Sequence, residues 1–453
     1  MARRGRPLSI ALLSLNILLL RPIESIAEVS RDLRTGFESW FHHDPVKPLL
    51  FPILSVEGGL KSSESDAVFD ADLRVRISPS HPESWALTSR NFFWGNPDEK
   101  SDIPLRLTFG RRRIPWSTLD TIWSLGIFEP LDQWDRLRPS SQGLTGVFGL
   151  TETRSFLVRF FVTGLYLPEA SPNVVLRGGR FAAEHPQATT SAPQTLSLLN
   201  RPTPMSYRIL APSLAKLLFR PGFAFSFENR AESIFHSKFS YAYLPLNHFP
   251  LALRAELSIP LDQISVNLRP RLLHHHLYSS EISLRSGGVE LGCAALIDDP
   301  VPDPIPVDET AAPLTTSTSI GPWLAWDFKT SRLLLSHLWT FAGIGPDQGP
   351  DATPGANLFS SRLFYRNATQ IGLKSTATGP DRVIWSLRAL HEWVIRGDWI
   401  SADLALPIRP SWVISLGGDL ISSWRDSAPG GGAEFLADLR PLGRVRFGVE
   451  YVF

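Results

Sequence analysis

The sequence predicts an all-β protein, a closed antiparallel transmembrane β-barrel of about 16–18 strands. Two observations lead to this fold class. Apolar and polar residues alternate strictly in segments that recur along the chain, as expected for strands with one apolar face. The sequence also has no long apolar run after Leu20. Without apolar helices, a chain spans lipid only as a closed barrel, because backbone groups in hydrocarbon need internal partners.

The first 27 residues have the layout of a secretory signal peptide. A basic head, an apolar run and two small residues follow one another: Arg3, Arg4 and Arg6, then Leu8–Leu20, then Ser25 and Ala27. We expect cleavage after Ala27, which leaves residues 28–453 as one barrel domain. A retained single-pass anchor is the alternative, but the apolar run is shorter than the ~20 residues that a spanning helix needs.

The last residues, 443–453, form the clearest predicted strand. One face carries Val445, Phe447, Val449, Tyr451 and Phe453, and the other carries Arg444, Arg446, Gly448 and Glu450. Successive strand side chains point to opposite faces, so this strand has one apolar face and one charged face. Alone, it fits either the edge of a soluble sandwich or a barrel strand that faces lipid outside and water inside.

Other segments favour the membrane alternative. The same alternation occurs in residues 68–78, 233–243, 251–260, 382–393 and 433–440. Their polar faces carry charges of both signs, as expected for a wet interior in which charges pair across strands. Aromatic residues lie near strand ends, where a bilayer meets water; they are Tyr241, Tyr243, Trp385, Trp393, Trp399, Trp412 and Trp424.

Composition excludes several functional classes. The formal net charge is +1, with 45 basic and 44 acidic residues, which argues against nucleic acid as a partner. The single cysteine, Cys293, excludes an intrachain disulfide and a cysteine-based metal site. An exported chain without disulfides suits a bacterial envelope better than a eukaryotic secreted scaffold.

The residues from 111 to 138 carry the densest group of charges. Leu119, Ile122, Trp123 and Ile127 have helical spacing, and Pro130 limits the helix. Our hypothesis is that residues 113–138 fold into the lumen as a constriction that sets solute selectivity. Its acids, Asp120, Glu129, Asp132 and Asp135, would then face a basic wall formed by Arg106, Arg111 and Arg113. The alternative is an ordinary loop whose surface ion pairs contribute about 0–1 kcal/mol each.

Further wall and site residues follow from the strand pattern. We expect lumen positions for Arg74, Arg106, Arg254, Arg388, Arg446 and Glu450. His274, His275 and His276 alternate faces on a strand, so we interpret them as rim residues and expect no metal site. Three long stretches rich in Pro, Ser, Thr or Gly are interpreted as loops of the same domain: Glu184–Ser206, Asp298–Ser319 and Gly345–Asn357.

The carboxy-terminal residues resemble those of Gram-negative outer-membrane β-barrels of porin type. In that class the barrel-assembly machinery reads a final Phe with apolar or aromatic residues at alternate positions, here Phe453, Tyr451, Val449 and Phe447. A weaker likeness lies in Gly110, Arg111, Ile114 and Trp116. The resemblance implies an outer-membrane protein in contact with lipid and passive diffusion of small hydrophilic solutes or ions; it leaves open whether the barrel is a monomer or a homotrimer.

Two other functional classes remain open from the sequence. A barrel with a plugged lumen would serve as a surface-binding or structural protein, with its long loops carrying recognition. A membrane hydrolase would need a serine and a histidine together. His236, His391, Ser237 and Ser386 are available, but no Gly-x-Ser-x-Gly motif accompanies them. We therefore expect neither catalysis nor a cofactor.

Overall fold

The barrel and its connections are described by a computed structural model. It describes residues 28–453 except 43–48, 65–66, 97–104, 172–173, 184, 186–191, 199, 230–233, 259–262, 312–313, 343–364, 378–381, 395, 410 and 424–442. The predicted signal peptide, the predicted strand 433–440 and the predicted loop 345–357 lie outside these residues. No helix in the described part of the chain is long and apolar enough to cross a membrane.

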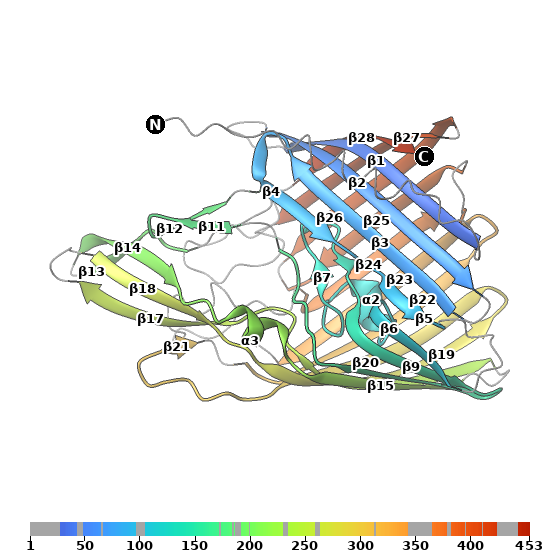
Figure 1. The fold of residues 1–453 in the computed structure, drawn as a ribbon, viewed down its shortest axis with the longest axis horizontal. Helices are drawn as coiled ribbons and strands as arrows, with labels where there is room; N and C mark the ends of the chain where they lie inside the picture. Colours follow the sequence, from blue (N-terminus) through green and yellow to red (C-terminus); the bar gives the residue numbers. More distant parts are fainter. Residues whose placement is uncertain are drawn as a thin grey trace.

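One large antiparallel sheet forms the wall of the barrel (Figure 1). Its strands are β1 (Glu28–His42), β2 (Leu49–Glu64), β3 (Ala67–Ser78), β4 (His81–Thr88), β5 (Phe92–Gly95), β6 (Arg106–Arg112), β9 (Leu144–Glu152), β10 (Phe156–Thr163), β15 (Gly222–Asn229), β16 (Phe235–Pro245), β19 (His274–Ser286), β20 (Val289–Pro300), β22 (Ser317–Asp327), β23 (Ser331–Ala342), β24 (Asn367–Ser375), β25 (Ile384–Glu392), β26 (Gly397–Arg409), β27 (Trp412–Ser423) and β28 (Arg444–Val452).

Pairing between the first and last strands closes the barrel. Phe37 of β1 is opposite Val449 of β28. The segments β4 and β5 both pair with β3, Leu87 with Val75 and Trp94 with Phe69, so together they occupy one position in the wall. The barrel therefore has 18 strands, which confirms the predicted fold class and lies within the predicted range.

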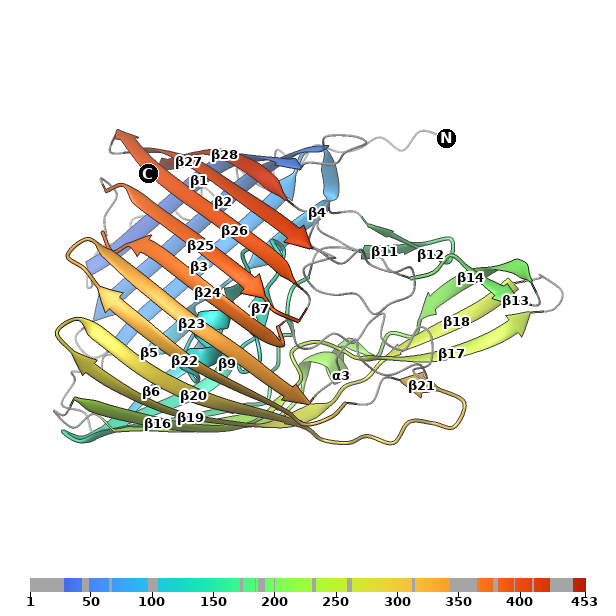
Figure 2. The same ribbon diagram turned by 180° about the vertical axis from the view of Figure 1, so that it is seen from behind.

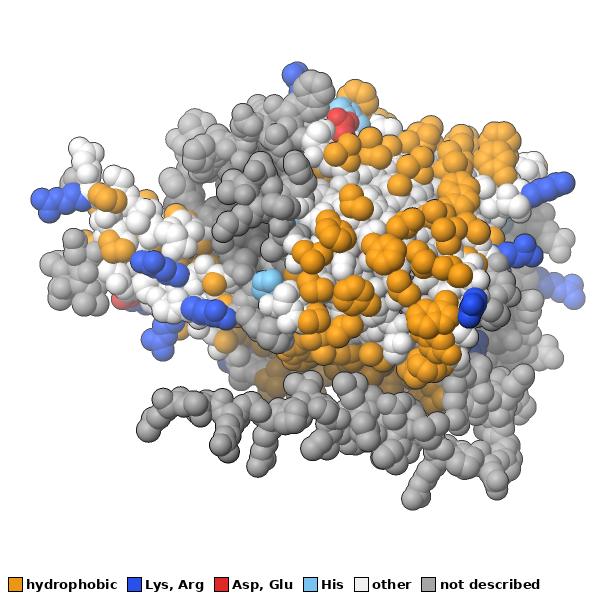
Figure 3. Space-filling view, turned by 90° about the horizontal axis from the view of Figure 1, so that it is seen from above, with side chains coloured by type: hydrophobic (Ala, Val, Ile, Leu, Met, Phe, Trp, Pro, Cys, Tyr) orange, Lys and Arg blue, Asp and Glu red, His pale blue; other side chains and the backbone are white. Residues whose placement is uncertain are grey.

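The two faces of the wall differ as the alternation predicted. In β28, Val445 is 62% exposed on the outside, whereas the neighbouring Arg444 is 3% exposed inside. Figure 3 shows hydrophobic side chains spread over the outer face, with Lys and Arg at its ends. Because no hydrophobic layer of the described chain covers this face, it is suited to contact lipid.

The two ends of the barrel have different connections. At the end that holds Phe453, the hairpins are short, such as residues 287–288 between β19 and β20. Gly287 and Gly288 both have positive φ there, 56° and 83°, which a two-residue hairpin of this type requires. At the opposite end, residues 164–221, 246–273 and 301–316 form long excursions.

These excursions build a second, smaller sheet that extends beyond the barrel end (Figures 1 and 2). Its strands are β13 (Thr195–Leu198), β14 (Arg201–Ile209), β18 (Gln263–Pro270), β17 (Leu251–Ser258) and β21 (Thr310–Ala311), and the hairpin of β11 (Val174–Arg177) and β12 (Arg180–Ala183) lies beside it. A small core of Tyr207, Ile264, Val266 and Leu268 supports the sheet. The stretches 184–206 and 298–319 are thus not simple loops.

This second sheet corrects one prediction from the sequence. The predicted strand 251–260 does alternate, but its described residues, Leu251–Ser258, form β17 of the five-stranded sheet and not a barrel strand. Arg254 is therefore exposed outside the lumen, where it pairs with Glu256 at 2.8 Å and with Asp308 at 2.5 Å. Alternation indicates only that one face of a strand is shielded from water. In β17 that face packs on the small core of the second sheet and does not face lipid.

Residues 113–143 connect β6 to β9 through the interior of the barrel (Figure 1). They contain the short helix α2 (Thr118–Trp123) and the strands β7 (Leu131–Asp132) and β8 (Ser140–Ser141). Ser117 caps α2 by accepting a hydrogen bond from the Asp120 amide. The helix ends before Pro130, at Ser124, which has a left-handed conformation with φ of 50°.

Candidate lumen constriction

We call residues 113–143 the inward segment. One side of it is fixed to the inner face of the wall from β16 to β24. Ser240 donates to the Trp116 carbonyl, Glu281 accepts from the amide and hydroxyl of Thr118, Trp123 donates to Ser336, and Gln370 donates to the Ile122 carbonyl, over distances of 2.6 to 3.2 Å. Hydrogen bonds to four separate strands hold the segment in place across the lumen.

Ion pairs attach the other side of the inward segment to the opposite wall. Arg444 of β28 donates through Nη2 to both oxygens of Asp135, at 2.8 and 2.7 Å. Through Nε it donates to Asp419 of β27 at 2.9 Å. Arg138 of the segment binds the same Asp419 at 2.6 Å and binds Asp403 of β26 at 2.9 Å. Both walls therefore hold the segment.

Another of the predicted lumen acids, Asp132, forms an ion pair with Arg76 of β3. The Arg76 guanidinium also lies over the Trp134 ring, at 4.7 Å from its centroid. Trp134 packs in turn against Trp40 and His185. Asp132 and Asp135 thus face basic residues across the lumen, as the hypothesis expected, but these are Arg76 and Arg444.

The two other acids of the prediction fold the inward segment itself. Asp120 accepts hydrogen bonds from the amides of Ile127 and Phe128, at 3.2 and 2.9 Å. Glu129 accepts from the Ile114 amide at 2.7 Å and from the Ser141 hydroxyl. Neither carboxylate is directed at a basic wall.

Burial also changes the protonation of Glu129, which lies on the inward segment and not on a spanning strand. Desolvation raises the pKa of Glu129 from its ordinary value of 4.5 to about 7, although the hydrogen bonds from Ser141 and Ile114 act in the opposite direction. A large part of this carboxyl population is therefore neutral near pH 7.

The basic residues predicted as the facing wall have other partners. Arg106 pairs with Glu152 at 3.0 Å on the neighbouring strands β6 and β9. Arg111 donates to the carbonyl and side-chain oxygens of Gln142, at 2.6 and 2.8 Å. Arg113 lines a cavity of about 440 Å³ within the inward segment. Arg111 thus holds the base of the segment, and Arg106 joins its two flanking strands. Glu129 lies within electrostatic range of Arg111 and Arg113 but forms its hydrogen bonds with Ile114 and Ser141.

Two cavities follow one another along the β25–β26 wall, and we call this line of cavities the path; the narrower one borders the inward segment. A cavity of about 250 Å³ on the side of the carboxy-terminal end is bordered by predicted wall residues and their neighbours: Glu38, Arg74, Ser386, Asp403, Arg446 and Glu450. A second cavity of about 20 Å³ is lined by Arg388 and Trp399 of the same two strands. Ser386 and Arg388 are two positions apart and share the inner face of β25, so the cavities are consecutive along the wall.

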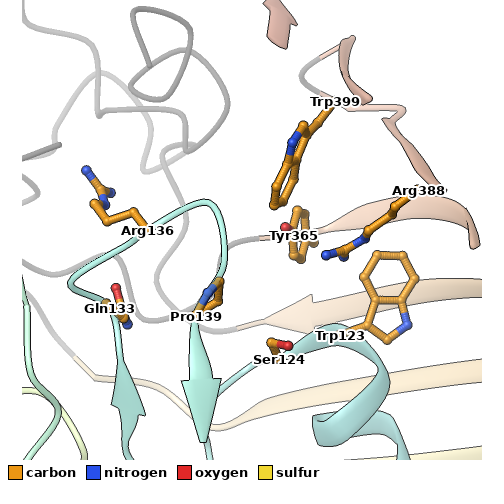
Figure 4. Close-up of a pocket in the computed structure, with 8 residues that line it drawn as sticks. All are labelled: Trp123, Ser124, Gln133, Arg136, Pro139, Tyr365, Arg388 and Trp399. Carbon is orange, nitrogen blue, oxygen red and sulfur yellow. The ribbon is translucent and has the colours of Figure 1, made fainter. Parts of the chain in front are cut away.

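The second cavity is the narrow point of this path (Figure 4). On one side the cavity is lined by Gln133, Arg136 and Pro139 of the inward segment. On the other side the Arg388 guanidinium is directed toward Tyr365 and lies over the Trp399 ring, 4.9 Å from its centroid. A volume of about 20 Å³ holds about one water molecule.

Both cavities contain basic side chains with unsatisfied buried donors; in the wider one these are Nε of Arg74 and Nε of Arg446, which have no hydrogen-bond partner among the described residues. In the wider cavity, Arg446 donates to Glu38 at 3.0 Å and binds Asp403, so these carboxylates have basic partners. At the narrow point, Nε and Nη2 of Arg388 and Nε1 of Trp399 are buried donors without a hydrogen-bond partner among the described residues. Unsatisfied donors at a positive charge favour an anionic or carbonyl group.

The histidines and serines considered for other chemistry are kept apart. His274 and His276 face outward: His274 stacks on Tyr243 at a centroid distance of 4.9 Å, and His276 meets the same ring at a tilt, at 5.0 Å. His275 points inward to Asp298. No group of three or more metal-ligating side chains is found in the part of the chain that the structure describes. His391 binds Asp398 at 2.7 Å, but Ser386 lies on the opposite face of β25, so these two do not form a serine–histidine pair.

The sequence reasoning missed Arg76 and Arg444 as wall partners of the inward segment, and Asp403 and Asp419 as the wall partners of Arg138. Arg76 lies on the charged face of the predicted strand 68–78, so the alternation of that strand could have identified it as a lumen residue. Asp403 and Asp419 lie on β26 and β27, where the predicted alternation was not extended. Their pairing with the inward segment depends on which strands come together around the barrel.

No protein-family model and no curated protein matches this sequence. Solved structures similar to this chain include Pseudomonas aeruginosa OccK2 (OpdF) in complex with glucuronate, with 11% identity, a TM-score of 0.48, and coverage of 94% of this chain and 96% of that chain. Acinetobacter baumannii OccAB3 has 8% identity and a TM-score of 0.46, with coverage of 94% of this chain and 99% of that chain. A loop-deletion mutant of OmpT, an outer membrane protein of Vibrio cholerae, has 8% identity and a TM-score of 0.40, with coverage of 95% of this chain and 100% of that chain. The architecture of the present chain is assigned from its own strand pairing.

Proposed function

We propose that the protein is an outer-membrane channel through which small hydrophilic solutes or ions diffuse passively. The observation that carries this proposal is the pair of cavities along the β25–β26 wall, of which the narrower one also borders the inward segment. A barrel of 18 strands is wide enough to enclose water. The inward segment would then narrow that water-filled space to a single polar passage.

The exported state and the membrane location belong to the same proposal. Residues 1–27 would direct export and be removed, and Phe447, Val449, Tyr451 and Phe453 would serve as the signal to the assembly machinery. The apolar outer face supports insertion into lipid, because exposed large hydrophobic residues such as Phe223, Val445 and Leu420 surround the barrel.

The narrow point favours anions over cations in this proposal. Arg388 carries a positive charge there, and two of its nitrogen atoms have no partner among the described residues. An entering anion would receive these hydrogen bonds, whereas a cation would meet only repulsion. In the wider cavity two carboxylates, Glu38 and Asp403, are paired with Arg446, so these two oppose this preference less.

Planar-bilayer recording of the purified, refolded protein tests the proposal. We expect discrete conductance steps and, under a salt gradient, a reversal potential with the sign of anion preference. A protein that folds, as judged by heat-modifiable migration on a gel, yet gives no steps would refute the channel. Steps with cation preference would refute the role of Arg388 while leaving the channel intact.

One observation favours a second candidate, a surface-binding barrel. The long connections at one end form a five-stranded sheet with its own core of Tyr207, Ile264 and Val266, and folded loops of this kind carry recognition in other barrels. Absence of conductance together with specific retention of a ligand by the intact barrel would support this candidate over the channel.

A further inference from the structure

A row of exposed apolar side chains continues beyond the barrel wall into residues 209–219, between β14 and β15. This stretch, which we call the apolar platform, contains the short helix α3 (Leu214–Leu218). Ile209, Leu210, Leu214 and Phe219 are 44%, 42%, 68% and 70% exposed. We propose that the platform binds the bilayer surface beside the barrel and inserts its apolar side chains among lipids with anionic headgroups.

The platform is continuous with the lipid-facing surface of the barrel. Phe223, Phe225 and Phe227 of β15 point outward at every second position. The same parity extends backward through the exposed Pro221 to Phe219, while Arg220 between them is buried. Phe219 therefore continues the outer row past the first residue of the strand.

Backbone hydrogen bonds fix the platform to the rest of the molecule. The Tyr166 amide donates to the Leu218 carbonyl at 2.7 Å, and the Leu210 amide donates to the Leu268 carbonyl at 2.7 Å. Arg220 binds the Leu273 carbonyl and lies over the Tyr166 ring. The exposed apolar side chains are thus held in a defined position at the rim of the barrel.

The neighbouring strands carry side chains suited to the boundary between lipid and water. Tyr243 of β16 stacks on His274 of β19 with an interplanar angle of 8°, and His274 contacts the Pro221 carbonyl at 3.1 Å. The Tyr241 hydroxyl meets His276 Nδ1 at 2.9 Å. Amphipathic rings collect at this depth of a membrane, so the platform lies next to the interfacial belt.

Charge identifies the lipid class. Residues 201–227 contain Arg201, Arg208, Lys216 and Arg220 and have no acidic residue. Arg208 and Lys216 are exposed on either side of Leu214. A surface with apolar side chains and flanking basic groups binds membranes that carry anionic headgroups. The apolar side chains of the platform are continuous with the lipid-facing side chains of β15. A protein bound to the platform would therefore have to displace lipid from the barrel face as well, which favours lipid as the occupant.

Site-directed spin labelling in phosphatidylglycerol-containing vesicles tests this inference. In a Cys293→Ser background, labels are placed by Leu214→Cys and Phe219→Cys on the platform, Phe225→Cys on the barrel face, and Leu257→Cys on the five-stranded sheet. Leu257 is the matched control, because it is a leucine 57% exposed outside the barrel. We expect labels at 214 and 219 to contact oxygen more than a water-soluble nickel chelate, as at 225, and the label at 257 to show the reverse.

Several outcomes would overturn the inference. Platform labels that resemble the label at 257 would show that the platform is in water. Platform labels shielded from both reagents would show a protein covering, such as a second copy. If the label at 225 were itself in water, the proposed membrane location would fail, which separates that failure from failure of the platform alone.

The role of charge is tested in the same system. Exchanging phosphatidylglycerol for a zwitterionic lipid should reduce the depth of the 219 label in the parent protein. It should have little effect in a variant that carries Arg208→Gln and Lys216→Gln. Equal depth in both lipids for the parent would overturn the assignment to anionic headgroups.

Discussion

Removing the positive charge at the narrow point should change which ions pass. In Arg388→Gln the side chain keeps an amide donor but loses the guanidinium that lies over Trp399. We expect the preference for anions to fall, because Arg388 is the cation whose donors remain unsatisfied at this point among the described residues. The 20 Å³ cavity brings any passing ion close to this side chain.

The size of the effect follows from Coulomb's law. An ion about 4 Å from a unit charge gains or loses about 1 kcal/mol in bulk water. This energy changes local occupancy about fivefold, down for an anion and up for a cation. The anion-to-cation permeability ratio should therefore fall by about fivefold to about 25-fold, and a drier passage would increase the change.

Reversal potentials in a salt gradient measure this ratio. Arg388→Lys keeps the charge and should retain most of the preference, and Arg254→Gln removes an arginine outside the lumen and should change nothing. The reasoning is refuted if Arg388→Gln and Arg254→Gln give the same reversal potential as the parent while all three conduct.

Three further changes test how the inward segment is held. Arg444→Met leaves Asp135 and Asp419 without this buried guanidinium, so the free energy of unfolding should fall by about 3–5 kcal/mol; an unchanged unfolding midpoint in detergent would contradict this. The raised pKa of Glu129 favours the protonated folded state, so its contribution to stability is lost as pH rises through about 7. Glu129→Gln should therefore flatten the pH dependence of the melting temperature, and an equal slope would count against it. Gly110 has a φ of 123° and its Cβ would meet the Phe92 carbonyl, so Gly110→Ala should lower the yield of folded barrel on a gel.

The wall of the barrel could be predicted from the sequence because its signal is local. In the final strand, Val445 and Arg444 occupy opposite faces by backbone geometry alone, whatever the rest of the chain does. The lack of apolar helices then left few ways to span lipid. The strand number stayed a range, because β4 and β5 share one wall position through a break near Asn91 that no alternation pattern indicates.

The five-stranded sheet could not be predicted in the same way. β17 has the alternation of a barrel strand, but it pairs with β18 and β21. β14 also pairs in parallel with β18, from a different excursion of the chain. Such pairing between distant segments depends on the positions of the barrel strands that bring them together, and this information is not local. Arg254 was misplaced for this reason.

For the constriction, too, the sequence indicated which residues fold inward but did not indicate which residues they pair with. The inward fold of residues 113–138 followed from apolar side chains and charges that lie close in sequence. The partners did not, because Arg444 lies 309 residues from Asp135. A charged residue in a lumen has many partners of opposite sign within reach, and the register of the closed sheet decides among them.

The number of charges along the passage is therefore a poor guide to its selectivity. Asp120 and Glu129 bind amides of the inward segment, and Asp135 and Asp403 bind arginines. Each of these acids is already satisfied by groups that hold the constriction in place, so it offers little to a solute. Selectivity rests instead on the donors left over after folding, which in the described lumen include those of Arg388 and Trp399 at the narrow point.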